Sequence, residues 1–262
     1  MDASSVLEFA LFLLVGFGAQ LIDGALGMAY GVSSTTFLIS LGVTPAHASA
    51  SVHFAELFTT AASGVSHWLN GNIDWRLFRR LAPAGIVGGA LGTFVLTGID
   101  GQAIRPYVVA YLAIMGLIVL SRAFLPRRQS GDRWRFAAPL GVGGGFADAI
   151  GGGGWGPIVT SSLLGAGNST RFTIGTVNAA EFLVTVTISA SFVIAMLSGH
   201  WEDADGLTAS AMPVAGLIVG GLIAAPMAGR ITRRVPHRPM LAAVGMLILT
   251  LAGVQIAQII GG

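Results

Sequence analysis

The sequence predicts an all-α polytopic membrane protein built from two repeats of inverted topology. Three observations support this fold class: an apolar composition, a similarity of the chain to itself, and an uneven distribution of Arg. Of the 262 residues, 53% are hydrophobic and 10% are charged, and the mean hydropathy is +0.77. A soluble domain is roughly 25% charged. The composition therefore excludes soluble, disordered and nucleic-acid-binding proteins, and it favours helices packed within a bilayer.

Two residue types that the chain lacks narrow its chemistry further. Cys is absent, and all 14 basic residues are Arg, so there is no Lys. Without Cys there are no disulfides or thiolate metal ligands, and without Lys there is no nucleotide-binding P-loop. The spacings of a Ser-His-Asp triad and of an H-E-x-x-H zinc motif are also missing. We therefore expect no enzyme, no cofactor, no metal and no nucleic-acid partner.

An internal duplication divides the chain at an offset of 125 residues. Residues 16–60 align without gaps with residues 141–185, and 12 of the 45 pairs are identical. A Gly-rich composition produces some identities, but it does not readily place two pairs of acids in one register: Asp23 with Asp148, and Glu56 with Glu181. We interpret residues 1–125 and 136–262 as repeats joined by an Arg-rich linker at residues 126–135.

Each repeat begins with two apolar segments that are too short for ordinary spans. The first two have 14 and 12 residues, which at about 1.5 Å per residue reach roughly 20 Å of a hydrocarbon core about 30 Å thick. They are either tilted spans or re-entrant hairpins, and the Gly residues and acids at Asp23–Gly31 and Asp148–Gly156 favour broken hairpins. The short segments are Phe9–Ile22, Tyr30–Leu41, Phe136–Ala147 and Trp155–Ala166.

Three full transmembrane helices follow in each repeat. Each contains about the 20 predominantly apolar residues that a span requires, and two of them enclose a single Glu. The expected helices are Ala46–Leu69, Leu77–Thr97, Arg105–Leu125, Arg171–Ser198, Gly206–Ala228 and Arg238–Ile260.

The distribution of Arg predicts the orientation of the repeats. Twelve Arg lie in Asn70–Arg80, Arg122–Arg135 and Gly229–Arg238, whereas Gly199–Gly206 has three acids and no Arg, and Gly98–Arg105 has one Arg. Loops rich in Arg face the cytoplasm. Asn70–Arg80 is then inside, while its counterpart Gly199–Gly206 is outside. The repeats are therefore inverted, as in many secondary transporters, and both termini are expected outside.

Several stretches combine a Gly-rich break, small polar residues and a helix that ends before a basic segment. In the first repeat they read GFGAQLIDGALGMAYG, SSTTFLISLGVTPAHASAS and NGNIDWRLFRRLAPAGIVGGALGT, and the second copy reads GVGGGFADAIGGGGWGPIVTSSLLGAGNSTRFTIGT. Together these stretches resemble the sulfite exporter TauE/SafE family over nearly the whole chain. The first break, DGALGMAYG, departs from the usual pattern because it is poorer in Gly.

The resemblance implies an exporter of small sulfur-containing anions, sulfite or an organosulfonate such as sulfoacetate, in the bacterial cytoplasmic membrane. Its partners are then the anion and the lipid bilayer, with a second copy of the chain as a further candidate. Moving one negative charge out of an inside-negative cell releases about 2.3 kcal/mol per 100 mV, so the membrane potential can drive export, with proton coupling as an additional source. The alternative is an anion channel, or an importer of a related oxyanion such as sulfate or thiosulfate.

Backbone at the Gly breaks is the first candidate binding element. A helix N-terminus offers N–H groups and a positive dipole end, and Gly allows an anion to approach the backbone closely. The alternative is that Gly only permits close helix packing, a role that we assign to Gly221. The candidate residues are Gly27, Gly31, Gly152, Gly153 and Gly154, with Trp155 either lining the site or packing against it.

Hydroxyl groups after each break are the second candidate element. Ser34 and Thr35 follow the first break, and Thr160 and Ser161 follow the second. Their hydroxyls can donate to sulfonate oxygens. Alternatively, they bond back to carbonyls of their own helix.

Four acids lie at equivalent positions within apolar segments. Glu56 and Glu181 sit mid-helix, and an acid within the membrane is a functional hypothesis by default. As carboxylates they would repel an anion, so we expect them to be protonated, proton-coupling, or structural. His53 and Asn178, one turn earlier, are candidate substrate donors, and His53 is also a candidate proton partner. Asp23 and Asp148 are expected to cap the helices that follow the breaks.

Arg171 stands at the start of a long helix, where the first repeat has Ala46. It is a candidate to attract anions from the cytoplasm. The alternative is that it only anchors the topology, as the other loop Arg residues do.

Overall fold

The computed structural model describes residues 3–26, 28–125, 136–202, 211–232 and 237–261, and the secondary structure in these ranges is entirely helical. The linker expected at residues 126–135, Gly27, and residues 206–210 of one expected helix lie outside the described residues. The helices are α1 (Ala3–Leu26), α2 (Tyr30–Ser40), α3 (Pro45–Leu69), α4 (Trp75–Thr97), α5 (Gly101–Phe124), α6 (Ala137–Gly151), the π-helix η2 (Gly156–Thr160), α7 (Ser161–Gly165), α8 (Thr170–Leu197), α9 (Ala211–Thr232) and α10 (His237–Gly261).

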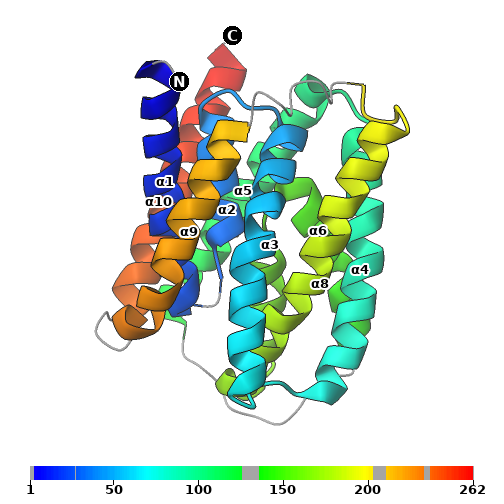
Figure 1. Cartoon of the computed structure of the whole chain (residues 1–262), viewed down its shortest axis with the longest axis vertical. Coiled ribbons are helices and arrows are strands. Elements are labelled where there is room, and N and C mark those ends of the chain that lie inside the picture. Colours follow the sequence, from blue (N-terminus) through cyan, green and yellow to red (C-terminus); the bar gives the residue numbers. More distant parts are fainter. Residues whose placement is uncertain (1–2, 27, 126–135, 203–210, 233–236, 262) are drawn as a thin grey trace.

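The helices pair across the two halves of the sequence. α1 packs along α9, and α4 packs along α6. α5 packs along α10, and α3 packs along α8. Figure 1 shows both chain ends at one end of this bundle and the turn between α3 and α4 at the opposite end. The two halves are therefore interleaved rather than placed side by side.

Five of the long helices begin and end within about four residues of the expected positions. For the sixth, expected at Gly206–Ala228, the start lies outside the described residues, and α9 ends at Thr232. The first helix is different: α1 has 24 residues, which gives it a length of about 36 Å, so the prediction of a short first helix was wrong. α1 continues through Asp23, whose carboxyl makes a hydrogen bond with the backbone of Tyr30. α6, with 15 residues, is short as expected, and it likewise runs past its acid, Asp148.

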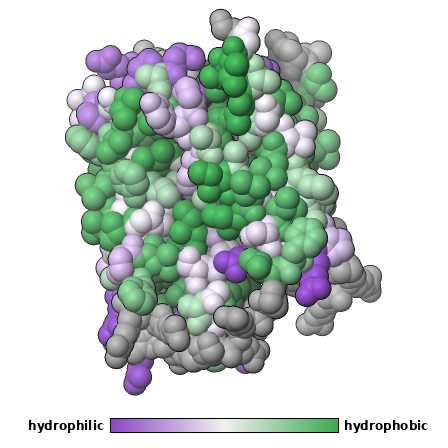
Figure 2. Space-filling model, turned by 180° about the vertical axis from the view of Figure 1, so that it is seen from behind, coloured by the Kyte–Doolittle hydropathy of each residue, from purple (hydrophilic) through white to green (hydrophobic). Residues whose placement is uncertain are grey.

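Four of the described helices are long and apolar enough to cross a membrane: α4, α5, α8 and, from Leu241, α10. Figure 2 shows hydrophobic side chains over the middle of one face and hydrophilic ones toward its two ends, the pattern of a protein surrounded by lipid. α3 is equally long, but it buries His47, Ser49, His53 and Glu56. It packs against α2, α5, α6, α8 and α9, and so it supplies a polar face to the interior.

Glycines allow the closest helix pairs to form. A Cβ on Gly145 of α6 would lie 3.0 Å from the backbone N of Gly89 on α4, and a Cβ on Gly216 of α9 would lie 2.8 Å from the carbonyl oxygen of Phe9 on α1. Small residues of this kind bring membrane helices into backbone contact. The α4–α6 and α1–α9 pairs therefore both rely on glycines that let the two backbones approach closely.

Candidate functional site

Two helix breaks, one from each half of the chain, meet inside the bundle. The first break lies before α2, at residues 28–29, and the second lies between α6 and η2, at residues 152–155. A Cβ on Gly31 would lie 2.6 Å from the Cα of Gly153, so the two backbones are in contact. The hydroxyl of Thr35 donates to the carbonyl of Gly152, and the hydroxyl of Tyr111 donates to the carbonyl of Gly153 at 2.9 Å. These bonds fasten the second break to α2 and α5.

The second break owes its shape to its residue types. Gly152 ends α6 with a φ of 62°, and Gly153 has a φ of 148°, conformations that favour Gly. Pro157 has no N–H, and the turn around it is π-helical rather than α-helical. π-helical turns occur frequently at functional sites. The first break is different, because Ala29 holds a φ of 97° without being a Gly.

Each break carries an aspartate that hydrogen-bonds the residue seven positions later. The Asp148 carboxylate accepts from the N–H of Trp155 at 3.0 Å, and the Asp23 carboxyl bonds the backbone of Tyr30. Each aspartate thus caps the start of the helix that follows its break, as expected, although the aspartate itself lies within the helix before the break. A carboxylate at the start of α2 offsets the positive end of that helix. An anion at the breaks therefore has to compete with it or bind beside it.

His53 on α3 joins the two halves through Asp148 on α6. Its Nε2 lies 3.3 Å from Asp148 Oδ2, and its Nδ1 lies 2.8 Å from the carbonyl oxygen of Ser49. The imidazole is fully buried. Both ring nitrogens thus face acceptor oxygens, and a neutral imidazole has only one N–H. The arrangement is satisfied when a proton is held between His53 and Asp148.

A narrow cleft beside the breaks gathers the remaining acids. Its lining contains three carboxyl groups and no basic side chain, and the space is narrower than a water molecule. Glu56 is 4% exposed, and among the described residues its carboxyl receives no hydrogen bond. The lining residues are Asp23, Tyr30, Glu56, Thr59, Thr60, Ser63, Asn178 and Glu181.

Three of the four predicted hydroxyls are buried without a partner. Ser34, Thr160 and Ser161 are each at most 2% exposed, and no hydrogen bond reaches their oxygens from the described part of the chain. The fourth, Thr35, is engaged with Gly152. A buried hydroxyl without a partner is costly. Each of these hydroxyls therefore has a donor that no described residue uses.

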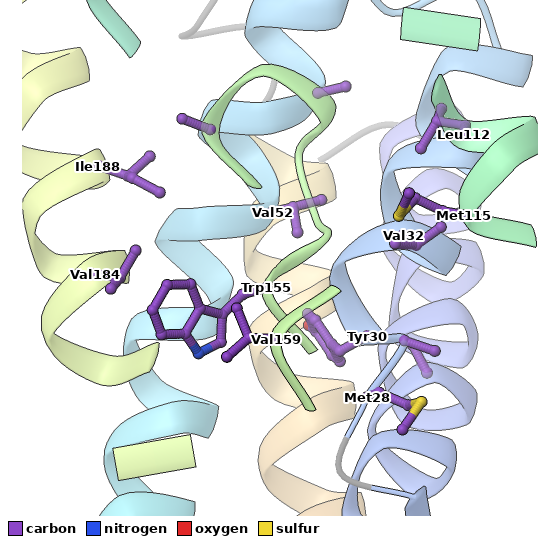
Figure 3. Packing of buried hydrophobic residues seen from close by; sticks show 14 of the residues in the cluster. Met28, Tyr30, Val32, Val52, Leu112, Met115, Trp155, Val159, Val184 and Ile188 are labelled. Carbon is purple, nitrogen blue, oxygen red and sulfur yellow. The ribbon is translucent and has the colours of Figure 1, made fainter. Parts of the chain in front are cut away.

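Other predicted residues are placed around or away from the breaks. Asn178 lines the cleft and donates to the carbonyl of Ile174 at 3.0 Å. Trp155 is fully buried, and its indole N–H donates to the carbonyl of Val177 at 3.1 Å; Figure 3 shows it on the side of Val184 and Ile188 of α8, with Tyr30 on the other side of the second break. A Cβ on Gly154 would meet the Tyr111 hydroxyl.

Arg171 is not brought to the breaks. It is exposed at the start of α8, where its Nε donates to Asn72 Oδ1 at 2.6 Å and its guanidinium donates to the carbonyl of Asn70 at 2.9 Å. It therefore ties α8 to the turn between α3 and α4, at the end of the bundle opposite the chain termini.

Sequence reasoning missed Tyr111, Thr59, Thr60 and Ser63 as neighbours of the breaks. Thr60 could have been found, because it is identical to Thr185 in the internal alignment. Nothing in the sequence distinguishes Tyr111, which belongs to an apolar helix outside the aligned region.

Comparison with known proteins yields one family and one curated relative. A sequence model of the family described as "Sulfite exporter TauE/SafE" matches residues 12–256. A protein of Bacillus subtilis strain 168, described as "Probable membrane transporter protein YtnM", is 42% identical over 249 residues, which cover 92% of this chain and 80% of the relative.

Proposed function

The chain belongs to the sulfite exporter TauE/SafE family, and from this premise we propose that it is a secondary transporter that exports sulfite or an organosulfonate across the bacterial cytoplasmic membrane. Its family and its relative are described as membrane transporters, and its apolar helices suit a multi-pass membrane protein. The family and the relative support a membrane transporter. The identity of the anion, the outward direction and the role of the membrane potential belong to our proposal.

Inverted topology of the two halves is part of the proposal, and the helix pairing supports it. The alignment at an offset of 125 residues matches α1 with α6. Beyond the aligned region we match helices by their order, so α4, the second long helix after α1, corresponds to α9, the second long helix after α6. The α1–α9 pair then becomes the α6–α4 pair when the halves are exchanged, and the α3–α8 and α5–α10 pairs become themselves. Such an exchange is expected of two repeats related by a pseudo-twofold axis.

The observation that carries the proposal is the meeting of the two breaks at Gly31 and Gly153 beside unpartnered buried hydroxyls. Irregular backbone within a membrane is tolerated only where it is buried in protein or lines a cavity. Ser34, Thr160 and Ser161 offer donors for sulfonate oxygens in that place. Substrate sites of many secondary transporters lie at broken helices between their repeats.

The closed cleft favours a transporter over a channel. In this conformation the space beside the breaks admits no water molecule, so an anion passes only after a rearrangement. Rearrangement of two repeats about a closed site is the movement that alternating access requires. The carboxyls of Glu56 and Glu181 line this space, and we assign them the binding of protons that accompany the movement.

Flux out of anion-loaded proteoliposomes tests the proposal. Purified protein is reconstituted, a K⁺ gradient with valinomycin sets the voltage, and labelled sulfite, sulfoacetate, sulfate, thiosulfate and chloride are compared. We expect saturable flux of sulfite or sulfoacetate that increases as the voltage drives negative charge outward. A conductance that does not saturate would indicate a channel, and preference for sulfate or thiosulfate with inward accumulation would indicate an importer.

A further inference from the structure

A pocket of about 350 Å³ opens at the Arg-bearing end of the bundle, away from the breaks. One wall is the start of α4, at Ile73–Leu77, and the other is the start of α8, at Asn168–Thr173. Figure 1 places this end, where α3 turns into α4, opposite the chain termini. The pocket is large enough for a small organic anion, in contrast to the closed cleft.

The wall formed by α8 offers groups that bind oxyanions. α8 has 28 residues, and Ser169, its N-cap, lines the pocket and makes no side-chain cap bond. The positive end of a long helix therefore lies at the pocket. Thr173 lines the pocket, is 1% exposed, and has a hydroxyl with no hydrogen-bond partner among the described residues. A buried donor of this kind is expected to have a ligand or a water.

Charge and apolar surface around the pocket suit the same ligand. Arg171 lies between the lining residues Ser169 and Phe172 in the chain and bonds Asn70 and Asn72 in the turn that leads to the opposite wall, so it joins the two walls and adds a positive charge near the pocket. The acid in the lining is Asp74, whose Oδ1 accepts the N–H groups of Arg76 and Leu77 and is therefore engaged in capping α4. The partly exposed rings of Trp75 and Phe172 add apolar walls.

The opposite end of the bundle has a counterpart that lacks these features. A second pocket, of about 440 Å³, is lined by Thr44 and Ala46 at the start of α3 and by Trp201 and Glu202 after α8, and Asp100 also lines it. In the internal alignment Arg171 corresponds to Ala46, and Thr173 corresponds to Ala48. Alanines thus take the places of the cation and the hydroxyl. The described lining here includes His200, Glu202 and Asp100, and Asp100 caps α5 by accepting the N–H groups of Gln102 and Ala103. The two ends of the protein therefore offer an anion different groups.

We propose that the pocket between the starts of α4 and α8 is the access site where the sulfonate or sulfite anion binds before it reaches the breaks. The anion oxygens take the Thr173 hydroxyl and the first turn of α8, and the rings of Trp75 and Phe172 contact the organic part of a sulfonate. This inference rests on the proposed function. The unlike counterpart at the other end gives the two ends different affinities for the anion, while the membrane potential sets the direction of net flux.

Binding to the full-length protein in nanodiscs tests the pocket independently of transport. Sulfoacetate is titrated calorimetrically in phosphatidylcholine nanodiscs. Thr173→Val should weaken binding about tenfold, which corresponds to the loss of one hydrogen bond, and Arg171→Gln should weaken it mostly at low salt. Thr187→Val, whose hydroxyl bonds only the carbonyl of Leu183 on the same helix, should bind as the wild type does.

Transport then separates the possible outcomes. In vesicles, Thr173→Val should raise the KM only when substrate is supplied at the end that carries Arg171. If both variants bind and transport as the wild type does, the access site is wrong while the proposed function stands. If the wild type neither binds nor moves any of the anions, the proposed function fails as well. If phosphatidylglycerol in the nanodisc abolishes sulfoacetate binding in the wild type but not in Thr173→Val, the pocket holds a lipid headgroup, and the inference is overturned.

Discussion

The imidazole of His53 in the first half of the chain lies 3.3 Å from the carboxylate of Asp148 in the second half. The equivalent residue on α8 is Asn178, whose amide instead donates to the carbonyl of Ile174 on its own helix. The two halves therefore contribute unlike partners to their aspartates, although the aspartates themselves bond their helix breaks in the same way. Only one side of this pseudo-symmetric arrangement can hold a shared proton.

Replacing His53 by Asn should destabilise the protein because Asp148 would be left as a buried charge without a counter-ion. Breaking a buried pair in this way typically costs about 3–5 kcal/mol, and the melting temperature in detergent should fall accordingly. The double variant His53→Asn with Asp148→Asn removes both charges and should recover much of the loss. If the two single losses simply add in the double variant, the pair does not share a proton.

Replacing Glu56 by Gln should flatten the pH dependence of transport, because Gln keeps the shape of the side chain and cannot titrate. The same holds for Glu181→Gln, whose carboxyl lines the same cleft. Substrate affinity should change less than the pH profile, since Gln fills the same space beside Gly31, where a Cβ would lie 3.0 Å from Glu56 Oε1. Transport rates of both variants are to be measured between pH 5 and 8. A wild-type pH profile in both variants would assign these acids a structural role.

Replacing Ala29 by Gly should stabilise the protein. Ala29 has a φ of 97°, and a left-handed conformation costs a residue with a Cβ about 1–2 kcal/mol, more than the additional backbone entropy that Gly loses on folding. We expect a gain of about 1 kcal/mol in thermal or denaturant unfolding. Ala110→Gly, on an exposed face of α5, is the control and should lose about 0.5–1 kcal/mol. Equal losses at both positions would contradict the strain at Ala29.

The sequence predicts the long helices, the breaks and the paired acids because each leaves a pattern in one dimension. Charge-free runs mark the helices, Gly clusters mark the breaks, and the acids fall in one ungapped register. The length of α1 could not be predicted in this way. An Asp in an apolar segment looks like the end of a helix, but α1 runs through Asp23, whose carboxyl bonds the backbone of Tyr30. Arg171 carries no sign in the sequence that it binds the Asn70–Asn72 turn.

Gly221 shows why packing roles are hard to predict from such a pattern. We expected it to face only neighbouring helices, remote from the site. A Cβ there would instead lie 2.9 Å from Cγ2 of Thr59 and 3.6 Å from the hydroxyl of Tyr30, two residues of the acidic cleft. The gapless alignment of the halves ends at Thr60, so the face that α9 presents could not be inferred. Gly221 therefore packs against the acidic cleft itself.

Two glycines of α6 allow a comparison between a glycine packed against another helix and a glycine beside open space. A Cβ on Gly145 would lie 3.0 Å from the backbone of α4, whereas a Cβ on Gly143 would meet nothing within 4 Å. Gly145→Ala should therefore force the helices apart and lower stability by about 1–3 kcal/mol, while Gly143→Ala should be neutral or gain about 0.5–1 kcal/mol from helix propensity. Melting curves in detergent compare the two. Equal effects would mean that α4 and α6 do not touch at Gly145.

The ends of α8 test the orientation of the whole bundle, because one helix carries a serine at each end. Ser169 precedes Thr170, Ser198 follows Leu197, and both are exposed. The chain has no Cys, so Ser169→Cys and Ser198→Cys each introduce one thiol at the smallest change in shape. The Ser169 end bears Arg171 and the Arg residues of early α4, and the positive-inside rule places it in the cytoplasm. A membrane-impermeant maleimide applied to intact cells should label Ser198→Cys and spare Ser169→Cys, and lysed cells should label both. Exclusive labelling of Ser169→Cys would mean that the bundle has the opposite orientation, with the Arg171 end and its pocket outside the cell.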